Sequence, residues 1–296
     1  MKVGFIGLGQ MGRPMALNML KSGADLTVFS AVTTPYPELE RAGAKTARKA
    51  SELGSVDVVF LSLPSADVVR DVLFGPGQLA AALGQGKVVV DTGTSAYSAT
   101  TELSSSLKAV RIDFLDAPVS GMEARAIEGT LTIMCGGARS IFERVEPLLR
   151  HLGNKILYMG GAGSGQLTKL INQLLFDINC AALAEILPMA AKMGLDPEQM
   201  GAVVNSGTGR SYASEFFVPR ILQGSFSAGY PMKHAYKDLV SAAELGARLC
   251  IPMPVLAAAT ATYQSALLNG HGDKDKGAVL LPFEELLGAR FRGAGH

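Results

Sequence analysis

The stretch Val3-Gly-Phe-Ile-Gly-Leu-Gly-Gln-Met-Gly12 decides the fold, because a short apolar strand runs directly into three glycines, Gly7, Gly9 and Gly12. A helical pattern follows over residues 11–21, and a second apolar strand follows at 26–29. In such a unit the first glycine permits a tight turn, the second lets a ligand approach the backbone, and the third lets the helix pack on the sheet. The helix N-terminus then faces an anion. The stretch predicts a pyrophosphate site of a dinucleotide; a glycine-rich turn without a ligand is the alternative.

Composition narrows the class of protein. The chain has 296 residues, of which 48% are hydrophobic and 18% charged, so it is long enough for two domains with large cores. The formal net charge is +1 with Lys and Arg scattered, which argues against nucleic acid or an anionic membrane as a partner. The N-terminus is a strand, and polar residues interrupt the most apolar stretch, 170–193. We therefore expect neither a signal peptide nor a membrane span.

Cysteine and histidine usage points to a reduced protein without a metal site. Cys135, Cys180 and Cys250 are odd in number, lie in apolar stretches and lack the spacing of metal ligands. They are predicted to be small core residues of a cytoplasmic protein. The four histidines form no cluster with each other or with cysteine.

The order of elements predicts an α/β fold, with an N-terminal doubly wound Rossmann domain and a C-terminal all-α domain joined by a long helix. Up to about residue 160, short apolar runs alternate with helical segments, which is typical of a parallel sheet covered on both faces. After the glycines of 160–165 only helical patterns follow. The predicted domains are 1–163 and 164–292, with a disordered tail at 293–296. The predicted strands after the first two are 56–62, 87–90, 112–115 and 131–134, and the predicted helices of the second domain are 166–193, with a bend at Pro188 left open, 197–204, 232–249 and 254–268.

Three further segments carry polar groups that suit chemistry. Asp116-Ala-Pro-Val-Ser-Gly121 follows a predicted strand, where open α/β sheets present ligand-binding groups, and Ser120 with the Gly121 amide suits a carboxylate. An ordinary turn is the alternative. In Lys169-Leu-Ile-Asn-Gln173, the spacing places Lys169, Asn172 and Gln173 on one helix face. A solvated face is the alternative there, but the helix dipole and burial both disfavour a charged Lys169, which suits proton exchange near neutral pH. Lys237-Asp-Leu239 alone indicates only a helix surface.

Together these motifs resemble the β-hydroxyacid dehydrogenase family, which includes 3-hydroxyisobutyrate dehydrogenases and tartronate semialdehyde reductases. The resemblance covers nearly the whole chain. Residues 4–15 look like the family's opening signature, and residues 116–121 with Gly129-Thr-Leu131 look like its substrate loop. Gly163-Ser-Gly165 with 169–173 looks like its catalytic helix, and 237–239 like its late lysine motif.

The resemblance implies an NAD(P)-dependent oxidoreductase that interconverts a small β-hydroxy carboxylate and its semialdehyde or keto acid. It implies that Lys169 is the catalytic acid/base and that Asn172 holds the substrate and the lysine. A homodimer or homotetramer is also implied, in keeping with the apolar excess of the second half. The implied substrate-binding residues are Ser120, Gly121, Met122, Asn172 and Gln173. The implied cofactor-binding residues are Gly7, Leu8, Gly9, Gln10, Met11, Gly12, Ser30, Leu63, Pro64, Thr94 and Lys237.

Three departures from the family pattern leave details open. Met122 stands where many members have a second glycine, and Gly93-Thr94 replaces a Ser-Thr pair. After the second strand the chain has Ser30-Ala-Val-Thr33, with neither a carboxylate for the ribose 2′-hydroxyl of NAD nor an arginine for the 2′-phosphate of NADP. The choice between NAD and NADP is therefore open. An imine reductase on the same scaffold is one alternative, although such enzymes usually replace the lysine; a non-catalytic dinucleotide-binding module is the other.

Overall fold

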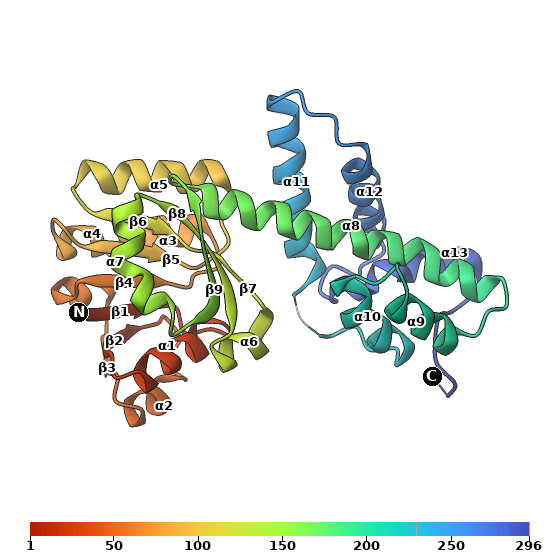
Figure 1. Cartoon of the computed structure of the whole chain (residues 1–296), viewed down its shortest axis with the longest axis horizontal. Coiled ribbons are helices and arrows are strands. Elements are labelled where there is room, and N and C mark those ends of the chain that lie inside the picture. The colour runs from red at the N-terminus through yellow and green to blue at the C-terminus, as the bar shows by residue number, and fades with distance from the viewer. Residues whose placement is uncertain (229, 296) are drawn as a thin grey trace. The chain divides into compact units, whose positions relative to one another are not determined.

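The computed structural model describes residues 1–228 and 230–295, and the chain divides into two compact units, Met1–Lys169 and Leu170–His296 (Figure 1). The division falls inside helix α8 (Ser164–Lys192), a little later than the predicted boundary at 163. The reason is local, because Gln166 in the first turn of α8 hydrogen-bonds to Gly93 and Ser95 of the first unit.

In the described part of the chain, the first unit holds a nine-stranded sheet in the order β3-β2-β1-β4-β5-β6-β8-β7, with β9 paired to β8. Neighbours from β3 to β6 are parallel, as predicted. The chain then turns back, so that β8 runs antiparallel to β6 and to β7. Strand β9 was not predicted and pairs parallel with β8. The strands are β1 (Lys2–Ile6), β2 (Asp25–Phe29), β3 (Lys45–Thr46), β4 (Val58–Leu61), β5 (Val88–Asp91), β6 (Asp113–Asp116), β7 (Val119–Ser120), β8 (Leu131–Gly137) and β9 (Gly153–Gly160).

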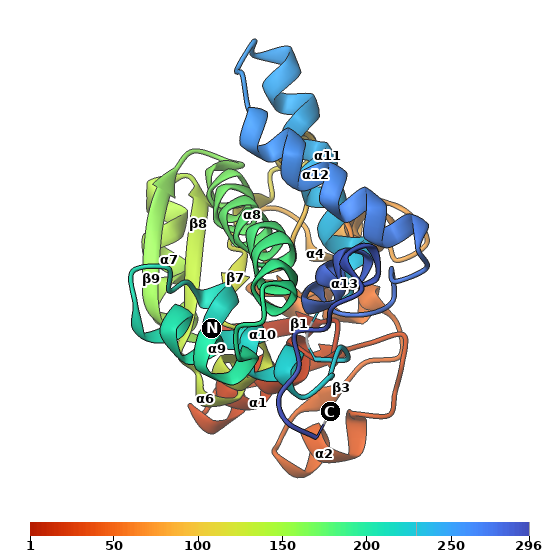
Figure 2. The ribbon, with the colours of Figure 1, turned by 90° about the vertical axis from the view of Figure 1, so that its right-hand side faces the viewer.

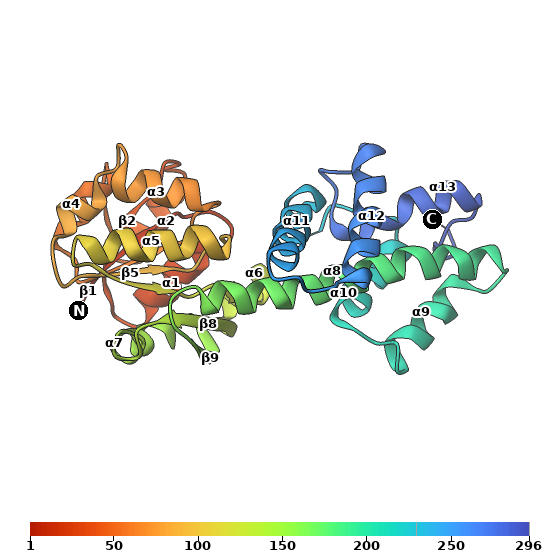
Figure 3. The same ribbon diagram turned by 90° about the horizontal axis from the view of Figure 1, so that it is seen from above.

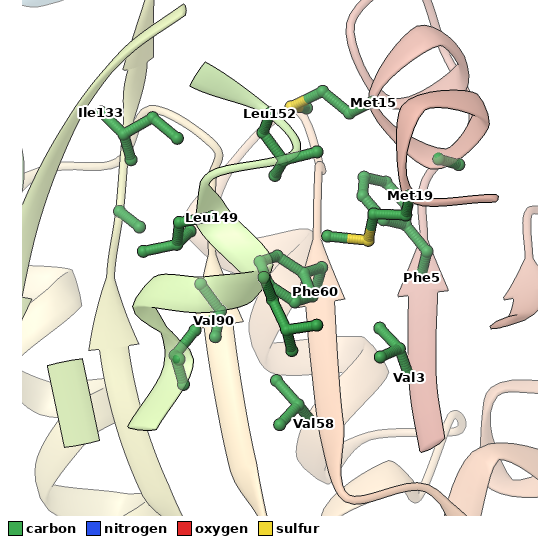
Figure 4. Packing of buried hydrophobic residues seen from close by; sticks show 14 of the residues in the cluster. Val3, Phe5, Met15, Met19, Val58, Phe60, Val90, Ile133, Leu149 and Leu152 are labelled. Carbon is green, nitrogen blue, oxygen red and sulfur yellow. The ribbon is translucent and has the colours of Figure 1, made fainter. Parts of the chain in front are cut away.

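Helices cover both faces of this sheet (Figure 3). Central strands such as β4 are therefore buried on both sides, which suits their continuous apolar sequence. Val58 and Phe60 of β4 pack in one cluster, whereas Val59 and Leu61 pack in the other. Phe5 and Phe60 stack in the first cluster with ring centroids 6.2 Å apart (Figure 4). The first cluster takes residues from α1 (Gly12–Lys21), α2 (Tyr36–Arg41), α6 (Met122–Glu128) and α7 (Arg139–Leu149); the second takes them from η1 (Ala50–Ser55), α3 (Ala66–Phe74), α4 (Leu79–Leu83) and α5 (Tyr97–Ala109).

In the described residues of the second unit the named elements are all helices, and loops connect them; one isolated β-bridge joins Pro231 and Asp275. Helix α8 is unbroken at Pro188 and ends before Gly194, which has φ +81°. Helices α11 and α12 run side by side (Figure 2). The core includes a buried ion pair between Lys276 and Asp177. Three elements were not predicted: α10, η2 and α13. The elements after α8 are α9 (Pro197–Ser206), α10 (Tyr212–Leu222), α11 (Met232–Arg248), α12 (Pro254–Leu268), η2 (Lys276–Leu280) and α13 (Leu281–Leu287).

The structure bears on three predictions: that the cysteines are core residues, that the chain has no membrane span, and that the tail 293–296 is disordered. Cys135 and Cys180 are buried, but Cys250 is exposed, so its prediction as a core residue is wrong; it follows the end of α11 with φ +54°, outside the packed helix. Helix α8 is long and apolar enough to cross a membrane by length and composition alone. Core helices of soluble proteins meet the same criteria. In the predicted tail, the Gly293 amide donates to the Leu222 carbonyl oxygen; His296 lies outside the described residues.

Candidate active site

The glycine-rich turn between β1 and α1 has the geometry expected of a pyrophosphate site. Gly7 has φ +94°, and a Cβ there would lie 2.2 Å from the Ser62 carbonyl oxygen. A Cβ on Gly12 would lie 1.8 Å from the Gly7 carbonyl oxygen, so α1 can approach β1 only with glycine at this position. A Cβ on Gly9 would meet nothing within 4 Å. Gly7 and Gly12 thus serve the turn itself, whereas Gly9 leaves open space for a ligand.

An open cleft of about 390 Å³ borders this turn. At its edge α1 begins without a side-chain cap, so the amides at its N-terminus suit an anionic group. The residues present therefore fit the pyrophosphate and adenosine side of a dinucleotide, which is an elongated anion. The cleft is lined by Leu8, Gly9, Gln10, Arg13, Thr34, Pro35, Glu38 and Glu123.

The loop after β2 is anchored by one tyrosine. The Tyr36 hydroxyl accepts a hydrogen bond from the Ser30 amide at 2.9 Å and lies 3.0 Å from the Ala47 carbonyl oxygen, to which it donates. The intervening side chains, residues 31–34, are exposed. Arg13, which lines the cleft, forms an ion pair with Glu38 at 3.0 Å.

The loops after β4, β5 and β6 lie next to one another at the carboxyl edge of the sheet. The Thr92 amide donates to the Leu61 carbonyl oxygen at 2.8 Å, and the Ala117 amide to that of Asp91 at 2.7 Å. Of the predicted residues, Leu63 and Pro64 follow β4, Thr94 follows β5 and Ser120 follows β6. Leu63 and Ser120 are half-buried, and Pro64 and Thr94 are exposed.

Asp116, the last residue of β6, caps the N-terminus of α8. Its Oδ1 accepts from the Gly163 amide at 2.7 Å and its Oδ2 from the Gln166 amide at 2.9 Å. Burial raises the pKa of this carboxyl, and the backbone amides partly offset the effect. Lys169 is itself 8% exposed. Asp116 therefore attaches the helix segment that carries Lys169 to the end of β6, four residues before Ser120 of β7.

Gln166 attaches the same helix turn to the loop after β5. Its Nε2 donates to the Gly93 carbonyl oxygen at 2.8 Å, and its Oε1 accepts from the Ser95 amide at 3.0 Å. These two hydrogen bonds hold the backbone of the residues immediately before and after Thr94. Sequence reasoning assigned no role to Gln166 or Asp116; an aspartate closing an apolar strand, as in Phe114-Leu-Asp116, was the available signal.

Asp91 repeats that signal at the end of β5, directly beside Asp116 in the parallel register. It is fully buried, and its Oδ1 accepts from the Gly93 amide at 2.9 Å. Burial raises the pKa of the Asp91 carboxyl to about 7; the Gly93 amide opposes the shift and the charge of Asp116 adds to it.

We expect Asp91 to make the protein less stable as pH rises from about 4 to about 7. The folded-state pKa lies above the unfolded value of 3.8, so the folded state holds this proton more tightly, and its advantage is lost as pH rises through that window. Asp91→Asn should remove this dependence. Calorimetric unfolding midpoints across pH, compared between wild type and variant, measure it; parallel curves would contradict the expectation.

The remaining predicted residues lie on separate elements. Met122 begins α6 with φ +60°, a left-handed conformation that favours glycine, and is half-buried. On α8, Asn172 is exposed and Gln173 half-buried, one turn after Lys169. Lys237 is exposed on α11 of the second unit. Within the described ranges, no group of three or more His, Cys, Asp or Glu side chains is arranged to hold a metal.

Comparison with known families matches both units. Residues 2–160 match the NAD binding domain of 6-phosphogluconate dehydrogenase, and residues 163–283 match the NAD-binding domain of NADP-dependent 3-hydroxyisobutyrate dehydrogenase. Together the two matches span most of the chain.

Curated and solved relatives agree with these matches. The chain is 37% identical over 294 residues to 2-(hydroxymethyl)glutarate dehydrogenase of Eubacterium barkeri, covering 99% of this chain and 98% of that one. It is 35% identical over 286 residues to 2-hydroxy-3-oxopropionate reductase of Escherichia coli, covering 96% and 97%. A 3-hydroxyisobutyrate dehydrogenase structure from Salmonella typhimurium superposes with a TM-score of 0.85 at 30% identity, covering 95% and 99%. The chain therefore belongs to the β-hydroxyacid dehydrogenase family of NAD(P)-binding oxidoreductases, which act on CH–OH groups.

Proposed function

We propose that the protein interconverts a small β-hydroxy carboxylate and its semialdehyde or keto acid, with Lys169 as the acid/base. The observation that carries the proposal is the burial of Lys169 in the first turns of α8, at a helix end held by Asp116 and Gln166 against the loops of Ser120 and Thr94. Lysine side chains are rarely buried to this extent, and a buried lysine amine can serve as a general acid or base.

Each group has a separate task in this proposal. In the reductive direction the Lys169 Nζ gives a proton to the substrate oxygen, and in the oxidative direction it removes the hydroxyl proton. The Ser120 hydroxyl and the Gly121 amide bind the substrate carboxylate, and Asn172 orients substrate and lysine. The turn Gly7–Gly12 holds the pyrophosphate of the cofactor, and Lys237 contacts the cofactor. When bound, the nicotinamide supplies or accepts the hydride.

Small hydroxy acids are the proposed substrates, because the two curated relatives above are named for such compounds. A panel of β-hydroxy carboxylates, scored by nicotinamide absorbance with NAD and NADP in parallel, tests the proposal. Turnover of at least one compound is expected. Turnover of imines in place of every hydroxy acid would overturn it.

We expect the same assay to show a preference between NAD and NADP below about a hundredfold, or 2.7 kcal/mol. The exposed residues 31–34 include neither a carboxylate nor an arginine. Nearby cations have other partners, because Arg41 donates to the Pro37 carbonyl oxygen and Lys45 pairs with Asp25. A preference above about a thousandfold would contradict this and would point to a cation outside this loop, such as Arg13, which lines the cleft while paired with Glu38.

A homodimer or homotetramer is proposed on the exposed apolar side chains of α8. Large apolar side chains gathered on one helix mark an interaction surface more often than a solvated one. Sedimentation at micromolar concentration checks this, and a monomer would contradict it. The exposed side chains of α8 are Ile171, Leu175, Ile186, Met189 and, just past its end, Met193.

A cytoplasmic location is proposed because the buried Cys135 and Cys180 are free thiols.

A further inference from the structure

We infer that Gln166 is a positioning residue that fixes the turn of α8 carrying Lys169 to the loop containing Thr94, so that the spacing between Lys169 and this loop stays constant. The inference rests on the proposed function, because it assigns a task to the surroundings of Lys169. It begins from the hydrogen bonds of one buried amide side chain.

The side chain of Gln166 uses both ends of its amide. It is 2% exposed, donates to Gly93 and accepts from Ser95. Because donor and acceptor are both required, no other side chain of this length satisfies the two backbone groups without a protonation change. The bonds flank Thr94 on both sides, and a buried pair of this kind holds a loop more rigidly than one bond.

The turn that carries Gln166 is fixed from a second direction by Asp116. Its carboxylate accepts hydrogen bonds from the amides of Gly163 and Gln166, and these two bonds restrain the start of the helix. Glycine makes the approach possible, because a Cβ on Gly165 would lie 2.3 Å from the Met134 carbonyl oxygen. Lys169 follows Gln166 by three residues and therefore shares its helix face. Gln166 thus transmits the position of the β5 loop to the lysine within one rigid turn.

Gln166→Met tests the inference by removing both hydrogen bonds while keeping the length of the side chain. We expect kcat to fall about ten- to a hundredfold, because small misplacements in an active site have effects of that size. The dissociation constant for NAD(P) should change much less than kcat, because the glycine turn is untouched and only the loop around Thr94 loses its hydrogen bonds. A merely structural role would instead lower the thermal midpoint and leave the kcat of the folded fraction unchanged, and that result would overturn the inference.

Gln166→Glu supplies a readout specific to positioning. A protonated carboxyl offers one donor and one acceptor, as the amide does, whereas the ionised form has no donor for Gly93. Asp116 accepts from the Gln166 amide, and Lys169 follows three residues later. Burial and the charge of Asp116 favour the protonated form, against the opposing charge of Lys169. The activity of the variant relative to wild type should therefore rise as pH falls. A ratio independent of pH, or full activity throughout, would overturn the inference.

Gln85→Glu is the matched control. Gln85 is exposed before β5, at the opposite edge of the sheet, and its Oε1 accepts from Arg111 at 3.1 Å, a role that glutamate retains. Its kinetics should match wild type at every pH. If wild type turns over no hydroxy acid, the proposed function fails, and amide hydrogen exchange still tests the clamp. Gln166→Met should then exchange the Ser95 amide faster than wild type, and unchanged protection would overturn the inference.

Discussion

Lys169→Ala is expected to lower kcat by about 10²- to 10⁴-fold, the usual effect of losing a general acid or base. The affinity for NAD(P) should stay within a few-fold of wild type, because Lys169 lies on α8 and the pyrophosphate turn precedes α1. Turnover of the best compound from the hydroxy acid panel and nucleotide titration measure the two quantities. Near-normal turnover would remove Lys169 from the mechanism.

Two further variants separate chemistry from packing at this position. Lys169→Met keeps most of the buried volume and lacks the amine, so it should lose as much activity as alanine with less loss of stability. Lys169→Arg keeps the positive charge, but a guanidinium does not release its proton near neutral pH, so it should also be inactive. Lys192→Ala, at the exposed opposite end of the same helix, should match wild type.

Gly9→Ala and Gly12→Ala are expected to fail in different ways. A methyl group on Gly9 enters open space, so folding should be unaffected, whereas a bound pyrophosphate would meet the added carbon. A steric cost of about 1 to 3 kcal/mol between this methyl group and the cofactor would raise the dissociation constant roughly 5- to 150-fold. A methyl group on Gly12 collides with the Gly7 carbonyl oxygen, so the thermal midpoint should fall.

Calorimetry and nucleotide titration on both variants provide the comparison. Unimpaired cofactor binding by Gly9→Ala would show that the ligand does not approach this turn. Equal loss of stability in the two variants would show that the open space at Gly9 is filled in the folded protein.

Local patterns predicted the features that depend on neighbouring residues. The roles of Gly7 and Gly12 follow from the strand-turn-helix order, and the predicted helix 254–268 coincides with α12. The bonds from Asp116 and Gln166 join residues far apart in the sequence, and no local pattern encodes them. Strand β9 (Gly153–Gly160) was missed because three of its residues are glycine or asparagine, and it acquires its conformation by pairing with β8.

In the loop after β2, the residue that fixes the backbone is different from the residues whose side chains are exposed. Tyr36 binds Ser30 and Ala47 through its hydroxyl, so the loop's path is set without help from the exposed side chains of 31–34. We therefore expect substitutions at these four exposed positions to change the stability of the fold only slightly. We also expect that exchange of these four consecutive residues can change the preference between NAD and NADP while the scaffold stays the same.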